Sequence, residues 1–382
     1  MRAREFYRGE GLPIAMVDLP PPGMTEPPFG RTRHPFFMHE MVRRQPIAAR
    51  ATRGALVDAL TAAPVDAPKR RLLCVGLGTS FHAALAAAHA ARTSLGDRFD
   101  AVATTSFDLL QEPHWIVPGT TALVFSAGGS TSLTLAAQRL LKEKGVPQVL
   151  ITSEPDTSSA AIADRTMITE HAKEESWTHT VSFTAALVAA GTLLEQWTGG
   201  STTTLLNEDA LTDAVTGALG CEPKVLDLVD PLADRDRILL VGSGSSEASA
   251  REAALKLREA AGRFCASVGV EELLHGVLPS IGPGCAVLAI SATDLERRRA
   301  LQGLAAARGL GAQTMLFDSS GGPGGEGICV VPPVPAPLPP AVVQVIPLQL
   351  LAYWAAVSNG RNPDVMGLDD PRVLEARRSF GI

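Results

Sequence analysis

The stretch Val75-Gly76-Leu77-Gly78-Thr79-Ser80 returns later in the chain as Val241-Gly242-Ser243-Gly244-Ser245-Ser246. Each copy ends an apolar run and opens an alanine-rich stretch, which is typical of a strand that turns into a helix. Two copies of one strand-turn-helix unit predict a duplicated α/β fold. The glycines and hydroxyls in the turns are typical of a site that binds an anion.

Length and composition narrow the class of protein. The chain has 382 residues, enough for two domains that each bury a core. Its net charge of −6 and the absence of a Lys/Arg run exclude the electrostatic footprint of a nucleic-acid-binding protein. The five cysteines occur singly, so neither a disulfide framework nor a metal site is expected. We expect a small-molecule partner, no metal or other cofactor, and a reducing cytoplasm.

The sequence also indicates no association with a membrane. The N-terminus carries arginines without an apolar segment behind them, so a signal peptide does not fit. No apolar stretch reaches about 18 uninterrupted residues, the length that a spanning helix needs. The apolar run from 348 to 357 is short and predicts a buried helix.

Composition and hydrophobic periodicity divide the chain into five parts. Pro46 predicts that the helical segment forms two short helices or one kinked helix. The expected parts are an extended N-terminal arm at 1–36, a helical segment at 37–67, a first α/β domain at 68–215, a second at 216–360, and a tail at 361–382.

Strands and helices are expected to alternate in both domains. This pattern predicts mainly parallel sheets that are covered by helices on both faces. The expected strands are 70–75, 101–105, 121–126 and 147–152, then 238–241, 286–291, 313–317 and 328–331. The expected helices are 80–93, 131–144 and 181–197, then 247–261, 295–308 and 341–357, with a linker-like polar stretch after Gly199.

Two turns of the first domain have the composition of an anion site. Residues 76–80 and 126–131 place glycines and hydroxyls where a strand is followed by a helix. Free backbone N–H groups and the helix dipole favour an anion there, although Ser and Thr also cap helices without any ligand. A dinucleotide site is the weaker alternative, because Phe81 replaces the third glycine, even though Asp97 and Asp100 lie where a ribose-binding acid would be expected.

The helix expected at 247–261 carries candidate acid-base residues. Alanines and Leu257 lie on one face, and Glu252, Lys256 and Glu259 lie on the opposite face. A solvated stripe with a Glu-Lys pair is the plain interpretation. His275 follows soon after, and a carboxylate and an imidazole in one pocket can share the movement of a proton.

Several stretches together carry a family resemblance, and they run in the family's order from about Met38 to the C-terminus. The chain resembles the tandem sugar isomerase (SIS) domain family, similar to the isomerase half of glucosamine-6-phosphate synthase and to SIS-type sugar-phosphate isomerases and deaminases. The resemblance implies an α/β fold of two tandem SIS domains, each a mainly parallel sheet flanked by helices in three layers. The matching stretches are 78–80, 126–131, 174–184, 252–259, 272–276 and 346–353.

The resemblance also implies roles for single residues. Glu259 matches the base that moves a proton between C1 and C2, and Lys256 matches a polar residue beside it. His275 matches a ring-opening histidine that the neighbouring subunit supplies, which implies a homodimer. The implied phosphate and sugar contacts are Gly78, Thr79, Ser80, Ser126, Gly128, Ser130, Thr131, Glu174 and Thr180.

The chain departs from the family pattern at several positions. The loop at 126–131 loses one hydroxyl and an acidic residue, and Leu274 and Val181 stand where lysines are common. Arg377 and Arg378 lie near the position of a catalytic tail lysine, but an arginine forms no Schiff base. The glutaminase half of the synthase is also missing from the sequence, so glutamine is not expected as an ammonia source.

These features favour a sugar-phosphate aldose-ketose isomerase, or an isomerising deaminase, that acts on a phosphorylated hexose or amino sugar. Two alternatives stay open: a phosphosugar-binding regulatory protein without catalysis, and an SIS enzyme of specialised metabolism that acts on an unusual sugar or cyclitol. The second copy of the turn has no glycine loop beside it at 291–294. We therefore expect the first turn to bind phosphate and the second to begin the helix that carries the chemistry.

Overall fold

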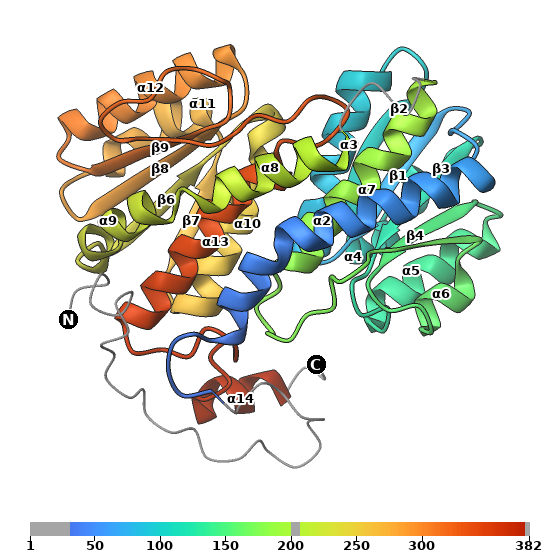
Figure 1. Ribbon diagram of the computed structural model, residues 1–382, viewed down its shortest axis with the longest axis horizontal. Helices are drawn as coiled ribbons and strands as arrows, with labels where there is room; N and C mark the ends of the chain where they lie inside the picture. The colour runs from blue at the N-terminus through green and yellow to red at the C-terminus, as the bar shows by residue number, and fades with distance from the viewer. Residues whose placement is uncertain (1–30, 200–206, 379–382) are drawn as a thin grey trace.

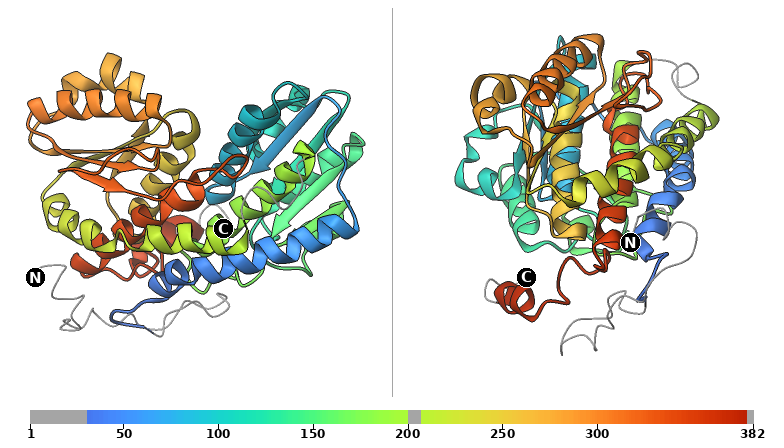
Figure 2. Two further views of the ribbon diagram at one scale, coloured as in Figure 1. Left: turned by 45° about the horizontal axis from the view of Figure 1, so that its top comes forward. Right: turned by 90° about the vertical axis from the view of Figure 1, so that its left-hand side faces the viewer.

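Two α/β domains form the body of the molecule (Figure 1). The structure is a computed structural model, which describes residues 31–199 and 207–378. Most of the arm expected at 1–36 therefore lies outside the described residues. Helix α8 runs from one domain to the other, and Figure 2 shows the two sheets as separate lobes.

Each domain contains a five-stranded, fully parallel sheet. The strand orders are β2-β1-β3-β4-β5 and β10-β9-β8-β6-β7, so β1 and β6 hold equivalent places and the predicted duplication is confirmed. Sequence patterns missed the short strands β5 and β7. The first sheet consists of β1 (Arg71–Gly76), β2 (Asp100–Thr105), β3 (Thr120–Phe125), β4 (Gln148–Thr152) and β5 (Arg165–Ile168). The second consists of β6 (Arg237–Val241), β7 (Cys265–Val268), β8 (Cys285–Ser291), β9 (Gln313–Asp318) and β10 (Ile328–Val330).

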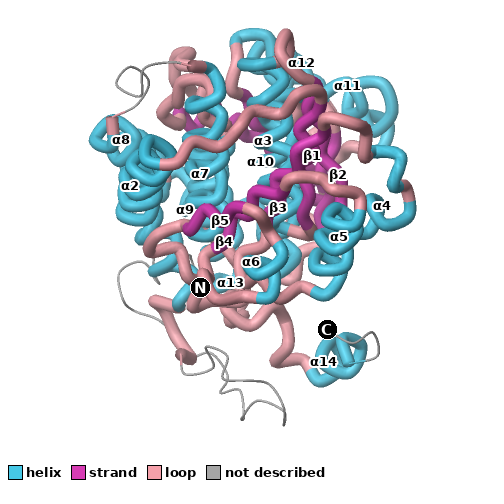
Figure 3. The backbone as a smooth tube through the Cα atoms, turned by 90° about the vertical axis from the view of Figure 1, so that its right-hand side faces the viewer, coloured by secondary structure: helices cyan, strands magenta, loops and turns pink. Residues whose placement is uncertain are grey.

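Helices cover both faces of each sheet, so each domain has the three layers that were predicted. Figure 3 shows α5 and α6 on one side of the first sheet and α7 on the other. The helices of the first domain are α3 (Thr79–Leu95), α4 (Ser106–Gln111), α5 (Ser132–Glu143), α6 (Ser158–Ile162) and α7 (Val181–Thr198). Those of the second are α10 (Glu247–Ala261), α11 (Val270–Glu272), α12 (Asp294–Gly309) and α13 (Ala341–Ser358). The predicted fold class is confirmed.

The helical segment before the first domain is one helix, α2 (Phe37–Ala62), which continues through Pro46. Of the two expected forms, the structure has a single helix, and two short helices are excluded because tertiary packing outweighs the missing N–H of proline. Gln45, next to the proline, is fully buried and its amide donates to Gln349 Oε1 at 2.6 Å. Its own Oε1 accepts a hydrogen bond from the hydroxyl of Thr184 at 2.5 Å.

The region after Gly199 is more regular than its polar composition suggested. Residues 200–206 lie outside the described part, but helices α8 (Glu208–Leu219) and α9 (Glu222–Ala233) follow it directly. Asn207 caps α8 by accepting a hydrogen bond from the N–H of Ala210 at 2.7 Å. The start of the expected linker thus lies outside the described residues, and the two helices after it were not predicted, because polar composition was given more weight than this cap and the apolar face of the helix.

The C-terminal segment also contains a helix, α14 (Pro371–Arg378), where the sequence predicted only a tail. Asp364 joins the start of this segment to the start of α2. Its carboxylate accepts hydrogen bonds from the N–H groups of Phe37 and Met38 at 2.9 and 2.7 Å. The segment is thereby held against the body of the protein.

Helix α13 lies at the centre of the core. Within residues 31–199 and 207–378, it is the one helix that is long and apolar enough to cross a bilayer, and 94% of it is buried inside the molecule. It packs against α10 and α9 of its own half and also against α7 and α8. Its apolar character is therefore explained by packing between protein elements.

The turn between β1 and α3 depends on glycine. A Cβ on Gly76 would lie 2.5 Å from the carbonyl oxygen of Ser80, in the first turn of α3. The strand and the helix could not approach each other so closely with any larger residue.

We expect Gly76→Ala to lower the free energy of unfolding by about 1–3 kcal/mol, because the backbone of α3 must shift to relieve the clash. Gly282→Ala is the matched control, since its Cβ would meet nothing within 4 Å, and it should change stability by less than about 0.5 kcal/mol. Urea unfolding of both variants measures the difference. Equal stability of the two variants would contradict this account of the turn.

Candidate functional site

A cavity of about 490 Å³ lies between the two domains. The first domain contributes the turn before α3, the loop after β3 and the segment before α7, while the second contributes α10. Met366 and Arg377, from the C-terminal segment, complete the wall. The volume is in the range of pockets that enclose small metabolites.

The wall from the first domain offers hydrogen-bond donors. The cavity is lined by six of the residues that the sequence proposes as phosphate and sugar contacts, namely Gly78, Thr79, Ser80, Ser126, Gly128 and Thr131. Ser126 is only 5% exposed, and neither its hydroxyl nor that of Ser80 makes a hydrogen bond to another described residue. The structure places Ser130 on the surface and not in this wall.

The wall from the second domain is charged and buried. Lys256 is 1% exposed, and its Nζ lies 2.6 Å from Glu259 Oε2 and 3.3 Å from Glu252 Oε1. It also donates to the hydroxyl of Thr79, across the domain interface, at 3.0 Å. The interpretation of these residues as a solvated stripe is therefore wrong, because α10 turns its polar face toward α3 of the other domain.

Mutual pairing keeps the buried groups charged. Burial alone would lower the pKa of Lys256, but Glu252 and Glu259 outweigh it and the pKa is raised. Burial alone would raise the pKa of Glu252, but Lys256 and His82 outweigh it and the pKa is lowered. His82, on α3, lies 2.7 Å from Glu252 Oε2. The ion cluster thus ties α10 to α3.

The two carboxylates beside Lys256 differ in their access to the cavity. The side chain of Glu252 is fully buried, whereas that of Glu259 is 16% exposed and lines the cavity. Glu259 is therefore the carboxylate that can meet a ligand.

His275 does not line this cavity in the single chain. It lies in a π-helical turn, Leu273–Val277, where its side chain is 75% exposed. Its Nε2 lies 3.3 Å from Glu271 Oε2 on the same surface. The structure therefore does not bring His275 together with Glu259 within one protomer.

Glu174 and Thr180 support the site from behind and do not line it. One oxygen of Glu174 accepts hydrogen bonds from the N–H groups of Thr180 and Ser182 at 2.6 and 2.8 Å, at the start of α7. Burial raises the pKa of Glu174 to about 7, against the effect of these hydrogen bonds. The hydroxyl of Thr180 is buried without a partner. Glu174 thus fixes the segment that carries Trp177 and His179 into the cavity.

Two residues that line the cavity were missed or left undecided by sequence reasoning. His179 lines both the main cavity and a smaller space behind it, and burial, helped by repulsion from Lys256, lowers its pKa to about 4. Its imidazole is therefore neutral near pH 7 and can donate to a ligand. Nothing in the sequence separated it from an ordinary core histidine. Of the two tail arginines, Arg377 lines the cavity.

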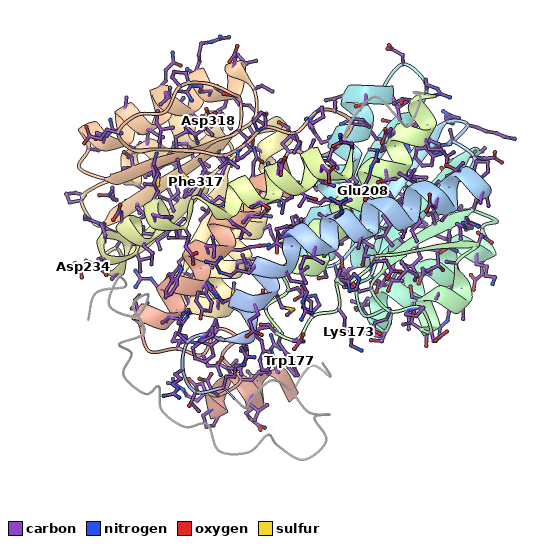
Figure 4. The ribbon with its side chains drawn as sticks, in the orientation of Figure 1. Lys173, Trp177, Glu208, Asp234, Phe317 and Asp318 are labelled. Carbon is purple, nitrogen blue, oxygen red and sulfur yellow. The ribbon has the colours of Figure 1, made fainter. Side chains whose placement is uncertain are left out.

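Trp177 lies on the side of the molecule that carries α14 (Figure 4). Together with Met366 and Arg377 it covers the part of the cavity that is nearest to the C-terminal segment. In the described part of the chain, no group of three or more His, Cys, Asp or Glu residues is arranged to hold a metal ion.

Replacing Lys256 by Met should lower the free energy of unfolding by about 3–5 kcal/mol, because Glu252 would stay buried without the ammonium group and with His82 as its remaining partner. Lys173→Met is the matched control. Lys173 projects from the surface (Figure 4) with a side chain that is 73% exposed, 2.9 Å from Glu154, and its loss should cost less than about 1 kcal/mol. Chemical denaturation of both variants tests the difference, and similar losses would refute the burial argument.

The stability of the protein should depend on the ionisation of Glu174. Its pKa of about 7 in the folded state exceeds the ordinary value of 4.5, so the folded state binds the proton more tightly and loses stability as pH rises through this window. Between about pH 5 and pH 8 the wild type should lose roughly 2–3 kcal/mol relative to Glu174→Gln, in which no charge is buried. The free energy of unfolding of both proteins is measured between about pH 5 and pH 8. If it changes with pH by the same amount in both, the proposed role of Glu174 ionisation is excluded.

The chain is similar to known proteins over most of its length. The chain is 30% identical over 345 residues to glutamine–fructose-6-phosphate aminotransferase (isomerizing) of Pyrococcus horikoshii, which covers 86% of this chain and 56% of that protein. The chain thus spans about half the length of the curated relatives it matches.

Solved structures share the fold. The C-terminal domain of glucosamine-fructose-6-phosphate aminotransferase from Francisella tularensis superimposes with a TM-score of 0.76 at 21% identity, covering 87% of this chain and 98% of that one. Tagatose-6-phosphate ketose/aldose isomerase from Escherichia coli gives 0.73 at 19% identity, covering 87% and 95%. The SIS domain model matches residues 67–196 and 231–359. The chain therefore belongs to the SIS-domain family, with two copies of the domain in tandem.

Proposed function

We propose that this protein is a sugar-phosphate aldose-ketose isomerase, or an isomerising deaminase, that acts on a phosphorylated hexose or amino sugar. One observation carries the proposal: a single cavity joins a hydroxyl-lined turn from one domain to a carboxylate-ammonium pair, Glu259 and Lys256, from the other. The activities in the names of the Pyrococcus and Escherichia relatives, an isomerizing aminotransferase and a ketose/aldose isomerase, support it.

The first wall suits the phosphate. Ser80 and Ser126 offer free hydroxyls, and the N-terminus of α3 directs its dipole toward the same space. Arg377 lines the cavity and adds a positive charge that, unlike that of Lys256, pairs with no buried carboxylate of the described residues. Binding by hydroxyls, backbone N–H groups and one arginine would offset the absence of lysines at positions 181 and 274.

The second wall suits proton transfer. In the open-chain sugar, Glu259 would remove the proton from C2 and return it to C1, while the hydroxyl proton of O2 moves to O1. The Lys256 ammonium, held 2.6 Å from Glu259, would stabilise negative charge on the enediol oxygens. The neutral His179 would donate a hydrogen bond to a sugar oxygen. Because an arginine replaces the tail lysine, this route contains no Schiff base.

His275 is proposed to act on the cavity of a second subunit. Its side chain is 75% exposed and lies outside the cavity of its own chain, so a homodimer could bring it to the neighbouring site. There it would assist opening of the sugar ring by proton transfer.

The same facts also support a second candidate, a sugar-phosphate-binding protein without catalysis. The loop at 126–131 has a reshaped Gly128-Gly129 centre, and His275 is absent from the cavity of the single chain. The presence of Trp177 in the wall further suits an unusual sugar or cyclitol in either a binding protein or an enzyme.

The test is exchange of the C2 proton of hexose and hexosamine 6-phosphates in deuterated water, followed by NMR. The wild type should exchange it, and Glu259→Gln should slow exchange about 10²–10⁴-fold without losing binding. Glu247→Gln, which changes an exposed carboxylate of the same helix, should exchange normally. Binding with no exchange in the wild type would favour the non-catalytic candidate.

Mixing two inactive variants tests the shared site. If His275 serves its neighbour, Glu259→Gln and His275→Asn refolded together should recover about a quarter of wild-type activity, because random heterodimers contain one intact site. No recovery in a mixture that size-exclusion chromatography shows to be dimeric would contradict the assignment of His275 to the partner's cavity.

A further inference from the structure

The two turns of the duplicated fold each have a glycine with positive φ at the equivalent position, but they differ in what lies beside that glycine. Gly78 and Gly244 are equivalent in the repeat and have φ angles of 54° and 57°. A Cβ on Gly78 would meet nothing within 4 Å, whereas one on Gly244 would lie 2.9 Å from Glu296 Oε1. The space above the first turn is open, and the space above the second is filled by a carboxylate of the protein itself.

Glu296 is held in the second turn by four hydrogen bonds. Oε1 accepts from the N–H of Ser245 at 3.0 Å and from its hydroxyl at 2.7 Å. Oε2 accepts from the hydroxyl of Ser246 and from the N–H of Ala292, both at 2.8 Å. Two oxygens of one anion are thus satisfied by the turn before α10 and by the residues after β8. Capping of its own helix α12 alone would not require the contacts to Ser245 and Ser246.

The sheet registers identify the same donors in the first domain. Val75 pairs with Val124 in one sheet, and Val241 pairs with Ala289 in the other. Counting forward from these pairs makes Thr79, Ser80 and Ala127 the counterparts of Ser245, Ser246 and Ala292. All three counterparts line the open cavity.

The counterpart donors are free to bind a ligand. The N–H groups of Thr79 and Ala127 and the hydroxyl of Ser80 have no acceptor among the described residues. The hydroxyl of Thr79 differs from that of Ser245, since it donates to Glu252 at 3.1 Å.

Two differences between the domains keep the first site open. The loop before α5 is longer than the loop before α12, and the third residue of α5 is Thr134, where α12 has Glu296.

We propose that both turns are the same anion site, and that Glu296 occupies the second one permanently, so that only the first is left for the phosphate of a ligand. The proposal rests on the proposed function for the identity of the first ligand. The occupation of the second site by Glu296 stands on its own contacts. It also explains why a duplicated protein would present one phosphate site in each chain.

Removal of the internal carboxylate tests the proposal. Glu296→Ala should open the second turn, so that isothermal titration of the full chain with inorganic phosphate finds one more site per chain than in the wild type. The variant should also be less heat-stable in chloride and regain stability in phosphate at matched ionic strength, with a larger shift in Tm than the wild type shows. Glu296→Gln is the matched control, because its uncharged side chain still fills the space; it should gain no site.

Each outcome decides one question. An extra site and a phosphate-dependent rescue in Glu296→Ala support the proposal, even if the wild type binds no phosphate, in which case the proposed function alone fails. Unchanged stoichiometry, or a variant that stays unfolded in both phosphate and chloride, would overturn it. An equal gain of a site by Glu296→Gln would also overturn it, because phosphate would then bind while a side chain still fills the second turn.

Discussion

The buried ammonium of Lys256 is the constraint on which the arrangement of the site depends. A charge that is 1% exposed must be paired, and its partners come from both domains: Glu252 and Glu259 from α10, and the hydroxyl of Thr79 from α3. The same α3 carries His82 against Glu252. Pairing of this charge therefore sets the distance between α3 and α10. Because Thr79 also begins α3, at the end of the turn that we propose to bind the phosphate, it fixes Glu259 relative to that turn.

Duplication of one α/β unit produced two equivalent turns with different roles. In the first domain the turn faces an open cavity, and the hydroxyl of Ser80 and the N–H groups of Thr79 and Ala127 have no acceptor among the described residues. In the second the equivalent groups bind Glu296, and the helix that follows contributes Lys256 and Glu259 to the shared cavity. In the function that we propose, one copy supplies binding and the other supplies chemistry, while Glu296 fills the second turn.

Much of the fold could be predicted from the sequence because its signals are local. The apolar runs of β1 and β6, with their glycine turns, identify the duplicated unit without any tertiary information. The exceptions are elements whose signal is weak or is overridden: β5 and β7 are four residues long, α2 continues through Pro46 because Gln45 is held by its neighbours, and α8 and α9 occupy a stretch that looked like a linker.

The site was less predictable, since it depends on which faces meet. The stripe of Glu252, Lys256 and Glu259 has the same pattern whether it faces water or another domain. His179 became visible as a candidate only when the segment fixed by Glu174 was seen to enter the cavity. The absence of His275 from the cavity of its own chain also depends on tertiary structure.

The proposal that one domain holds the phosphate and the other transfers the proton is tested most directly by a crystal structure with a bound hexose 6-phosphate. We expect phosphate density against Ser80, Ser126 and the N–H of Ala127, with C1 and C2 of the sugar beside Glu259. A sugar bound with its phosphate elsewhere, or with C1 and C2 directed away from Glu259, would contradict it.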